Sequence, residues 1–299
     1  MALRSRLNHL TLVSSEQDAF ADALWRQLRL EAEQAYAGSP TLAPLFLDSI
    51  LNQPSFEAAL FHRVAVRLKN DVISQPVILQ AFHRASGASE EIGSGLKADI
   101  AAVLDRDPAC ERLIEPFIYF KGFHALQAHR LTHWLWNAGE RDFALYLQSR
   151  SSEVFQTDIH PAARIGRGVF LDHATGLVVG ETAVIEDDVS LLHDVTLGGT
   201  GKVTGDRHPK IRRGVLIGAG AKVLGNIEVG HCSRIAAGSV VLASVPPKKT
   251  VVGVPGRVVG EAGCAEPART MDQIIAQKAF DRSFAQQTRT PGPDLVGNG

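Results

Sequence analysis

The chain has few cysteines and no excess charge of either sign. Its 299 residues include 3 Cys, and 31 Lys and Arg against 32 Asp and Glu leave a formal net charge of −1. Three widely separated cysteines (Cys110, Cys232 and Cys264) form no disulfide framework and suggest a reducing compartment, so we expect a cytoplasmic protein. The missing basic excess argues against a nucleic-acid-binding protein.

Long apolar runs are missing too. The sequence contains no run of about eighteen apolar residues, so we expect no membrane span. Near the N-terminus, Asn8, His9 and Thr11 interrupt any apolar region, and no signal peptide is predicted.

What the sequence does contain is a six-residue repeat, interrupted briefly after Leu171 and at length after Leu197. An aliphatic residue recurs at Ile159, Ile165, Leu171, Val179, Ile185, Leu191, Leu197, Ile211, Ile217, Val223, Val229, Ile235 and Val241. Neither a helix, with a period of about 3.6, nor a strand, with a period of about 2, gives this pattern. A hexapeptide period is typical of a parallel β-helix, whose triangular coils each take about eighteen residues. We therefore predict a prism with these aliphatic residues inside.

The residues before the repeat favour helices. Helical spacing of apolar residues predicts helices near 19–36, 42–51, 54–70, 77–85, 96–104, 121–137 and 141–150, with a further short one at 271–280. We therefore predict an α+β chain with an all-helical domain at 1–157, a β-helix domain at 158–260 and a largely flexible tail at 261–299.

The interruption between Leu197 and Ile211 is too long for a corner and must leave the prism as a loop. Long loops on a rigid scaffold are often functional. Arg207 and His208, at its far end, suit an anion such as a carboxylate. An ordinary surface loop is the alternative.

One corner of the predicted prism combines an acid with an imidazole. His173 follows Asp172, and coils of about eighteen residues put Asp158 on the coil next to His173, about three residues out of register. A nearby carboxylate suits a histidine that acts as a general base. The alternative is that Asp172 and His173 are merely polar residues on an outer face of the prism. Asp107 precedes Pro108, which ends a helix, and the local pattern alone makes Asp107 a capping or solvated charge.

These segments resemble the serine O-acetyltransferases of the hexapeptide-repeat acyltransferase family over roughly residues 15–260. The matching motifs are Asp105-Arg-Asp-Pro, Phe120-Lys-Gly-Phe-His-Ala-Leu-Gln-Ala, Asp158-Ile-His-Pro-Ala-Ala-Arg-Ile-Gly, Leu171-Asp-His-Ala-Thr-Gly, Val179-Gly-Glu-Thr-Ala, Val195-Thr-Leu-Gly-Gly-Thr-Gly, Asp206-Arg-His-Pro-Lys-Ile and Gly253-Val-Pro-Gly-Arg. The resemblance implies a left-handed parallel β-helix. It also implies acetyl transfer from acetyl-CoA to the hydroxyl of L-serine, giving O-acetyl-L-serine and CoA in cysteine biosynthesis.

The resemblance also assigns roles to residues. It implies that His173 is the base oriented by Asp158, that Asp107 and Asp172 hold the serine ammonium, and that Arg207 and His208 hold its carboxylate. Backbone N–H groups of Gly198 and Gly199 are candidates for the oxyanion. Acetyl-CoA is expected along Gly199, Thr200, Ala219 and Ala237, with its phosphates near Lys222, Lys248 or Lys249. We expect no metal and no permanently bound cofactor.

The family also implies partners. Members form trimers with active sites between neighbouring prisms, the helical domains join two trimers, and cysteine inhibits at the serine site. The family's C-terminal isoleucine, which docks into O-acetylserine sulfhydrylase, is absent from Gly297-Asn298-Gly299, so we do not expect that mode of docking.

Three alternatives stay open. An acetyltransferase for homoserine or a sugar shares the prism and His173. A β-helix carbonic anhydrase requires three imidazoles on a metal, and the repeat supplies His173, His193, His208 and His231. A non-catalytic scaffold needs no Asp158 and His173 pair.

Overall fold

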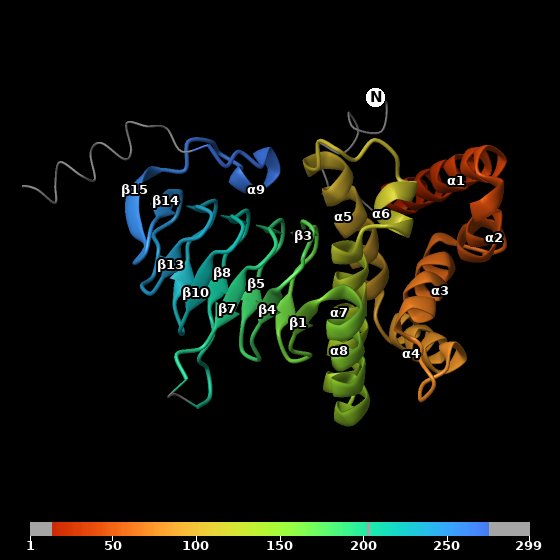
Figure 1. Cartoon of the computed structure of the whole chain (residues 1–299), viewed down its shortest axis with the longest axis horizontal. Helices are drawn as coiled ribbons and strands as arrows, with labels where there is room; N and C mark the ends of the chain where they lie inside the picture. Colours follow the sequence, from red (N-terminus) through yellow and green to blue (C-terminus); the bar gives the residue numbers. More distant parts are fainter. Residues whose placement is uncertain (1–13, 202–203, 275–299) are drawn as a thin grey trace, which may run out of the picture.

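The computed structural model describes residues 14–201 and 204–274. A helical part comes first and a stack of short strands follows, beginning at Thr157 (Figure 1). The helices are α1 (Ser14–Gly38), η2 (Pro40–Leu42), α2 (Ala43–Phe46), η3 (Leu47–Leu51), α3 (Phe56–Leu68), α4 (Gln75–Ala88), α5 (Glu90–Arg106), α6 (Ile114–Ile118), α7 (Lys121–Asn137), α8 (Arg141–Phe155) and α9 (Pro267–Thr270).

The predicted helices of the first part are confirmed in place, with two differences. The segment 42–51 is divided among η2, α2 and η3, and the short helix α6 was not predicted. In the tail, the predicted helix 271–280 is wrong for Met271–Ile274, which are not helical; residues 275–280 lie outside the described residues. The tail's described helix, α9, ends at Thr270 instead.

The strands stack into three faces of a prism. They are β1 (Thr157–Ile159), β2 (Arg164–Ile165), β3 (Phe170–Leu171), β4 (Leu177–Val179), β5 (Val184–Ile185), β6 (Ser190–Leu191), β7 (Thr196–Gly198), β8 (Lys210–Ile211), β9 (Leu216–Ile217), β10 (Lys222–Leu224), β11 (Glu228–Val229), β12 (Arg234–Ile235), β13 (Val240–Val241), β14 (Lys249–Val252) and β15 (Arg257–Glu261). Face A has the order β1-β4-β7-β10-β13, face B β2-β5-β8-β11, and face C β3-β6-β9-β12-β14-β15. All pairs are parallel except β14 with β15.

The repeat's aliphatic residues fill the prism, as predicted. Twelve of the thirteen are buried in one core, and Ile165 packs against it partly exposed. Aliphatic residues at equivalent positions of adjacent coils stack on one another; Ile217, for example, pairs with Ile235. The segment after Gly198 leaves the prism and returns at Lys210, so Leu197 still pairs with Val223. The predicted fold class, a helical part followed by a β-helix, is confirmed.

The helical part packs on the first coil through close polar contacts. Arg130 on α7 donates to the Gly166 carbonyl at 2.8 Å and pairs with the fully buried Asp99 of α5. Arg106, at the end of α5, donates to the Val189 carbonyl at 3.3 Å. These contacts hold the middle of α7 and the C-terminal end of α5 against the prism. No helix among the described residues is long and apolar enough to cross a membrane.

Candidate active site

The corner between β3 and β4 carries the first group of predicted residues. His173 and Ala174 both have positive φ angles, 56° and 59°, which are uncommon for residues other than glycine. Helix α7 begins directly against this corner, and a Cβ on Gly122 would lie 2.1 Å from the Leu171 carbonyl oxygen. Lys121 reaches across to the Thr175 hydroxyl at 2.5 Å. The corner is therefore held by the start of α7.

Two carboxylates and two imidazoles gather there. The exposed His173 has its Nε2 3.7 Å from Asp172 Oδ1, and its ring lies edge-on to His193 with centroids 5.8 Å apart. Burial raises the pKa of the Asp172 carboxyl; His173 lowers it and the nearby Asp107 carboxylate raises it. The structure thus brings Asp107, from the end of α5, to the same corner as Asp172 and His173. Two adjacent carboxylates suit a cation, and an exposed imidazole suits proton transfer.

The second group lies where the long loop returns to the prism. Arg207 donates from Nη2 to Glu181 Oε2 at 2.8 Å, and its backbone N–H donates to Thr182 Oγ1 at 3.0 Å. His208 is buried, and its Nδ1 accepts from the Thr182 backbone N–H at 3.1 Å, so the ring proton belongs on Nε2. Burial, followed by the charge of Arg207, lowers the pKa of His208. A neutral donor therefore stands beside a guanidinium, which suits a carboxylate ligand.

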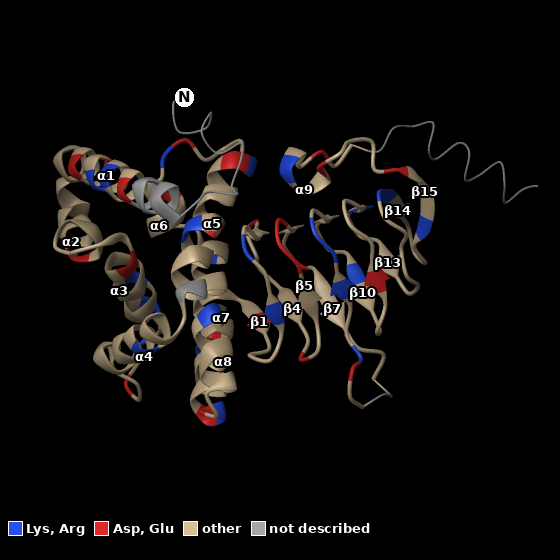
Figure 2. Ribbon diagram, turned by 180° about the vertical axis from the view of Figure 1, so that it is seen from behind, with Lys and Arg blue, Asp and Glu red and all other residues tan. Residues whose placement is uncertain are grey.

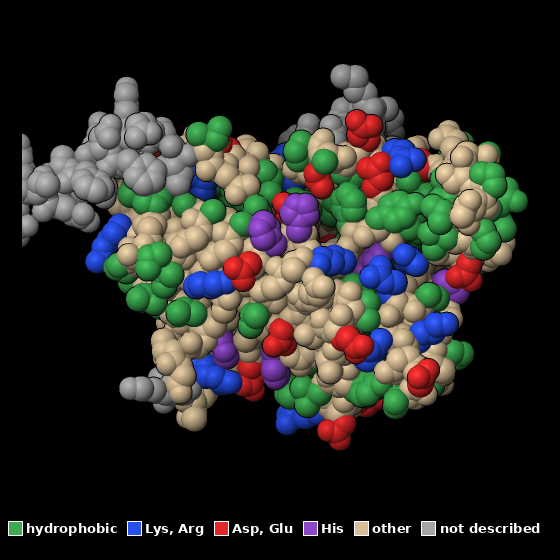
Figure 3. All heavy atoms as spheres, viewed as in Figure 1, with side chains coloured by type: hydrophobic (Ala, Val, Ile, Leu, Met, Phe, Trp, Pro, Cys, Tyr) green, Lys and Arg blue, Asp and Glu red, His purple; other side chains and the backbone are tan. Residues whose placement is uncertain are grey.

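These two groups occupy opposite edges of face A. The first follows β3, where face C turns into face A, and the second lies at the turn from face A into face B. Figure 3 shows histidine side chains gathered at an upper and at a lower place on this side of the molecule. The six predicted catalytic and serine-binding residues therefore do not meet in one cleft of one chain.

Asp158 does not lie beside His173 within the chain. It is exposed on β1 opposite Val178, and its Oδ1 accepts from Gln148 Nε2 at 2.6 Å. Burial lowers the pKa of His160, and the Glu181 and Asp158 carboxylates partly offset this effect, so Asp158 lies with the second group. The expected single-chain pair fails because Asp158 stands in mid-strand, whereas His173 stands in the preceding corner of the prism.

The residues expected to contact acetyl-CoA are divided in the same way. Ala219 and Ala237 continue the edge of the first group, because Gly220 N–H donates to the His193 carbonyl and Gly238 N–H to the Ala219 carbonyl. Gly199 and Thr200 follow β7 at the other edge. Of the lysines considered for the phosphates, Lys222 pairs with Asp194 at 2.9 Å and Lys249 pairs with Glu261, while Lys248 is exposed.

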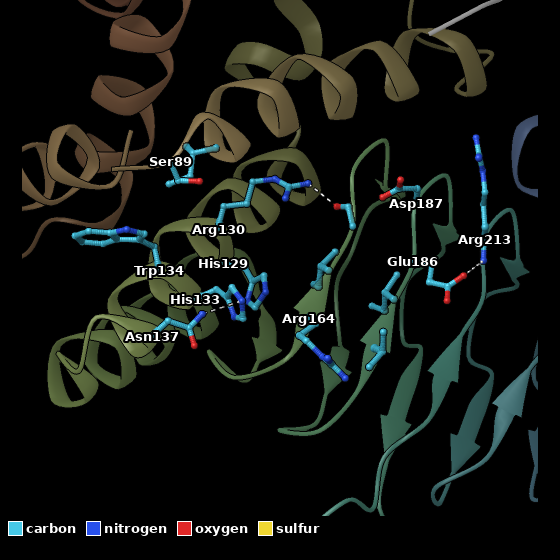
Figure 4. A pocket seen from close by; sticks show the side chains of 15 residues that line it. Ser89, His129, Arg130, His133, Trp134, Asn137, Arg164, Glu186, Asp187 and Arg213 are labelled. Atoms are coloured by element: carbon cyan, nitrogen blue, oxygen red, sulfur yellow. Dashed lines mark hydrogen bonds between the residues drawn. The ribbon is translucent and has the colours of Figure 1, made fainter. Parts of the chain in front are cut away.

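A separate cavity of about 580 Å³ lies between α7 and strands β2 and β5 (Figure 4). Its lining includes His129, His133, Arg164 and Glu186, but none of the predicted site residues. The predicted chemistry lies on open edges of the prism instead. Among the described residues, no three His, Cys, Asp or Glu side chains gather as a metal site requires.

Sequence reasoning missed the residues that orient the second group. Glu181 and Thr182 hold Arg207 and His208, and Gly180 leaves room for the imidazole, since a Cβ there would lie 2.0 Å from the His208 ring. All three stand in the motif Val179-Gly-Glu-Thr-Ala. This motif was visible in the sequence, but only the fold shows that Gly180, Glu181 and Thr182 contact Arg207 and His208.

Comparisons with known proteins agree along the chain. Residues 24–128 match the family model "Serine acetyltransferase, N-terminal", and residues 208–243 match "Bacterial transferase hexapeptide (six repeats)". The serine acetyltransferase of Salmonella typhimurium is 52% identical over 252 residues, 84% of this chain and 92% of that protein.

Solved structures extend this likeness to three dimensions. A serine acetyltransferase from Brucella abortus in complex with coenzyme A is 60% identical, with a TM-score of 0.81, covering 85% of this chain and 100% of that one. A serine acetyltransferase in complex with cysteine is 48% identical, with a TM-score of 0.83 and coverage of 85% and 99%.

Proposed function

The chain belongs to the serine acetyltransferase family, and from that premise we propose that it transfers the acetyl group of acetyl-CoA to the hydroxyl of L-serine. The products are O-acetyl-L-serine and CoA, in cysteine biosynthesis. One observation carries the choice of an amino acid as acceptor: two carboxylates, Asp107 and Asp172, stand at one edge of face A and the Arg207 and His208 donors at the other. An amino acid presents one cation and one anion, which match these two sets.

In this proposal His173 is the general base. It takes the proton from the serine hydroxyl as the oxygen attacks the thioester carbonyl carbon. The tetrahedral oxyanion collapses, the C–S bond breaks, and the departing thiolate takes the proton from the imidazolium. With 72% of its side chain exposed, His173 is open to a bound substrate, and Asp172 stabilises the transient positive charge. Backbone N–H groups of Gly198 and Gly199 are proposed donors to the oxyanion.

We further propose that the complete site forms between two chains. The first group of one prism would face the second group of its neighbour, which brings Arg207, His208 and Asp158 of the second chain to His173 of the first. Asp158 would then orient the imidazole across the interface. The positions of these residues on opposite edges of one face support this arrangement. Head-to-tail contacts of this kind close into a ring, and we propose that the ring is a trimer.

In the proposed trimer, acetyl-CoA would bind between two neighbouring prisms. Ala219 and Ala237 of one prism would border one side of the pantetheine arm, and Gly199 and Thr200 of the neighbour the other side. The helical part, at residues 1–157, is proposed to join two trimers. Its exposed apolar side chains Leu30, Tyr36 and Leu42 give it a surface suited to such a contact.

Cysteine is proposed to inhibit by binding at the serine site, since it offers the same ammonium and carboxylate. The related enzyme solved with cysteine supports this. The odd number and wide separation of Cys110, Cys232 and Cys264 in the sequence support a cytoplasmic location.

The first experiment measures thiol release from acetyl-CoA with L-serine, homoserine or a sugar as acceptor. We expect strong dependence on serine, whereas equal or faster turnover with homoserine would overturn the acceptor. A second experiment tests the shared site by mixing two inactive variants, His173→Ala and Arg207→Ala. Co-expressed chains would regain part of the activity if sites form between chains, because some sites then hold two intact halves. Inactive mixed oligomers would contradict the shared site.

A further inference from the structure

The run Asp105-Arg106-Asp107 is held from both sides by residues distant in the sequence. Helix α5 ends at Arg106, and Asp107 follows it in the partly exposed position from which it reaches Asp172. The two residues before Asp107 make strong contacts with other elements, whereas Asp107 Oδ1 accepts only from the Ala109 backbone N–H, at 2.8 Å, among the hydrogen bonds of the described residues. The position of the Asp107 carboxylate therefore depends on how its neighbours are held.

The first contact comes from the segment after the β-helix. The guanidinium of Arg269 on α9 makes a bidentate contact with the Asp105 carboxylate: Nε donates to Oδ2 at 2.8 Å and Nη2 donates to Oδ1 at 3.2 Å. Both side chains are about one third exposed or less. A forked pair of this kind sets the orientation of its carboxylate as well as its distance. Figures 1 and 2 both show α9 on the side of the prism that faces α5.

The second contact comes from β6. The buried Arg106 donates from Nη1 to Ser190 Oγ at 3.1 Å, and Ser190 Oγ in turn donates to the Ala268 carbonyl at 2.7 Å. Ala268 is the neighbour of Arg269. These bonds close a ring that runs from α5 to β6, from β6 to α9, and from α9 back to α5.

We propose that Arg269 is a positioning residue for serine binding: through Asp105 it holds the end of α5 so that the Asp107 carboxylate meets the substrate ammonium. The C-terminal segment thus contributes to the site without touching the substrate. This inference rests on the proposed function, because it concerns the ammonium site of the same reaction.

The test is steady-state kinetics of Arg269→Gln in the full-length protein. We expect the KM for serine to rise about tenfold, the usual effect of losing a charge-assisted hydrogen bond, with kcat changed less than about twofold. The KM for acetyl-CoA should stay unchanged, since Asp107 holds only the amino acid. Arg269→Lys keeps the positive charge but loses the two-point hydrogen bonding of the guanidinium. Its KM for serine should therefore lie between those of the wild type and Arg269→Gln.

A swapped pair separates positioning from folding. Asp105→Arg combined with Arg269→Asp restores the contact in reverse and should recover part of the serine KM lost in either single variant. The matched control is Arg84→Gln, which removes a similar forked pair with Glu140 on the far helices and should leave both KM values unchanged.

The outcomes distinguish the inference from the function it rests on. A wild-type protein without serine-dependent turnover would overturn the proposed function. An active wild type whose Arg269→Gln variant keeps a normal serine KM would overturn the inference alone. An equal rise in both KM values, with a lowered melting temperature, would also overturn it, because it would show a general structural role.

Discussion

Arg207 and Glu181 form an ion pair at 2.8 Å across two coils of the prism, so the guanidinium proposed to bind the serine carboxylate is oriented before substrate arrives. The Arg207 hydrogen bond lowers the pKa of the Glu181 carboxyl, which keeps it charged near neutrality. We therefore predict that Glu181→Gln raises the KM for serine about twofold to fivefold, the range for a partly exposed pair, with little change in kcat. Initial rates at varied serine measure this.

The matched control for this change is Glu186→Gln. Glu186 pairs with Arg212 at 2.7 Å and accepts from the Arg213 backbone N–H; within the described part of the chain, neither partner belongs to the proposed site. It should leave the KM for serine unchanged. A fall in that KM for Glu181→Gln would contradict the prediction, since it would mean that Glu181 competes with the substrate carboxylate.

Gly180 is predicted to be intolerant of any side chain because His208 lies against it. A Cβ at this position would lie 2.0 Å from the Cδ2 and Nε2 atoms of the ring, so Gly180→Ala must displace the imidazole. We expect kcat/KM for serine to fall about tenfold to a hundredfold, as for other small misplacements of a binding group. The circular dichroism spectrum should be retained.

The control for the glycine is Gly87→Ala on α4. Nothing lies within 4 Å of a Cβ built there, and alanine favours a helix. This variant should keep wild-type kinetics. Unchanged serine kinetics in Gly180→Ala would show instead that the His208 position does not matter for binding.

The fold could be predicted from the sequence because the repeat reports directly which side chains face inward. Residues such as Leu191 and Ile217 pair in register, whatever the loops between them do. The short helix α6 escaped prediction because Pro116 stands within its few residues and no apolar period develops. The described part of the tail depends on α5 and β6, distant elements that local pattern does not report.

The site could be predicted only in part. His173 and Asp172 stand in one motif, and the fold keeps them together. The partnership of Asp158 with His173 was inferred from coils of about eighteen residues. In the structure Ile159 pairs with Val179, 179 − 159 = 20 residues on, whereas Ile217 pairs with Ile235, 235 − 217 = 18 residues on. Sequence periodicity also did not reveal that the groups around Asp172 and Arg207 lie at opposite edges of one face.

The choice of base is tested by comparing the two adjacent imidazoles at the β3–β4 corner. We predict that His173→Ala lowers kcat by at least about a hundredfold, the typical effect of losing a general base, while the KM for serine changes little. His193→Ala should retain most of the activity, because the His173 ring is the one that lies beside Asp172. A larger loss in the His193 variant would transfer the role to that residue.

One of the two buried histidines of α7, His124, leads to a prediction about stability and pH. His124 is fully buried with Nε2 bonded to the Phe117 carbonyl, and burial lowers its pKa to about 3. Between its unfolded value of about 6.5 and the folded value, the unfolded state binds a proton that the native state does not. The contribution of His124 to the free energy of unfolding is therefore fully present above a pH of about 6.5. It is lost as the pH falls toward the folded pKa, by about 1.4 kcal/mol per pH unit.

The measurement is urea unfolding of wild type and His124→Gln at neutral pH and near pH 5, at equal protein concentration because the proposed oligomer would stabilise the native state by mass action. Glutamine keeps a donor for Phe117 but does not titrate, so the free energy of unfolding of the variant should depend less steeply on pH. His83→Gln, at an exposed position of α4, is the control and should follow the wild-type slope. Equal slopes for wild type and His124→Gln would show that His124 binds protons equally in the native and unfolded states, which would contradict the lowered pKa.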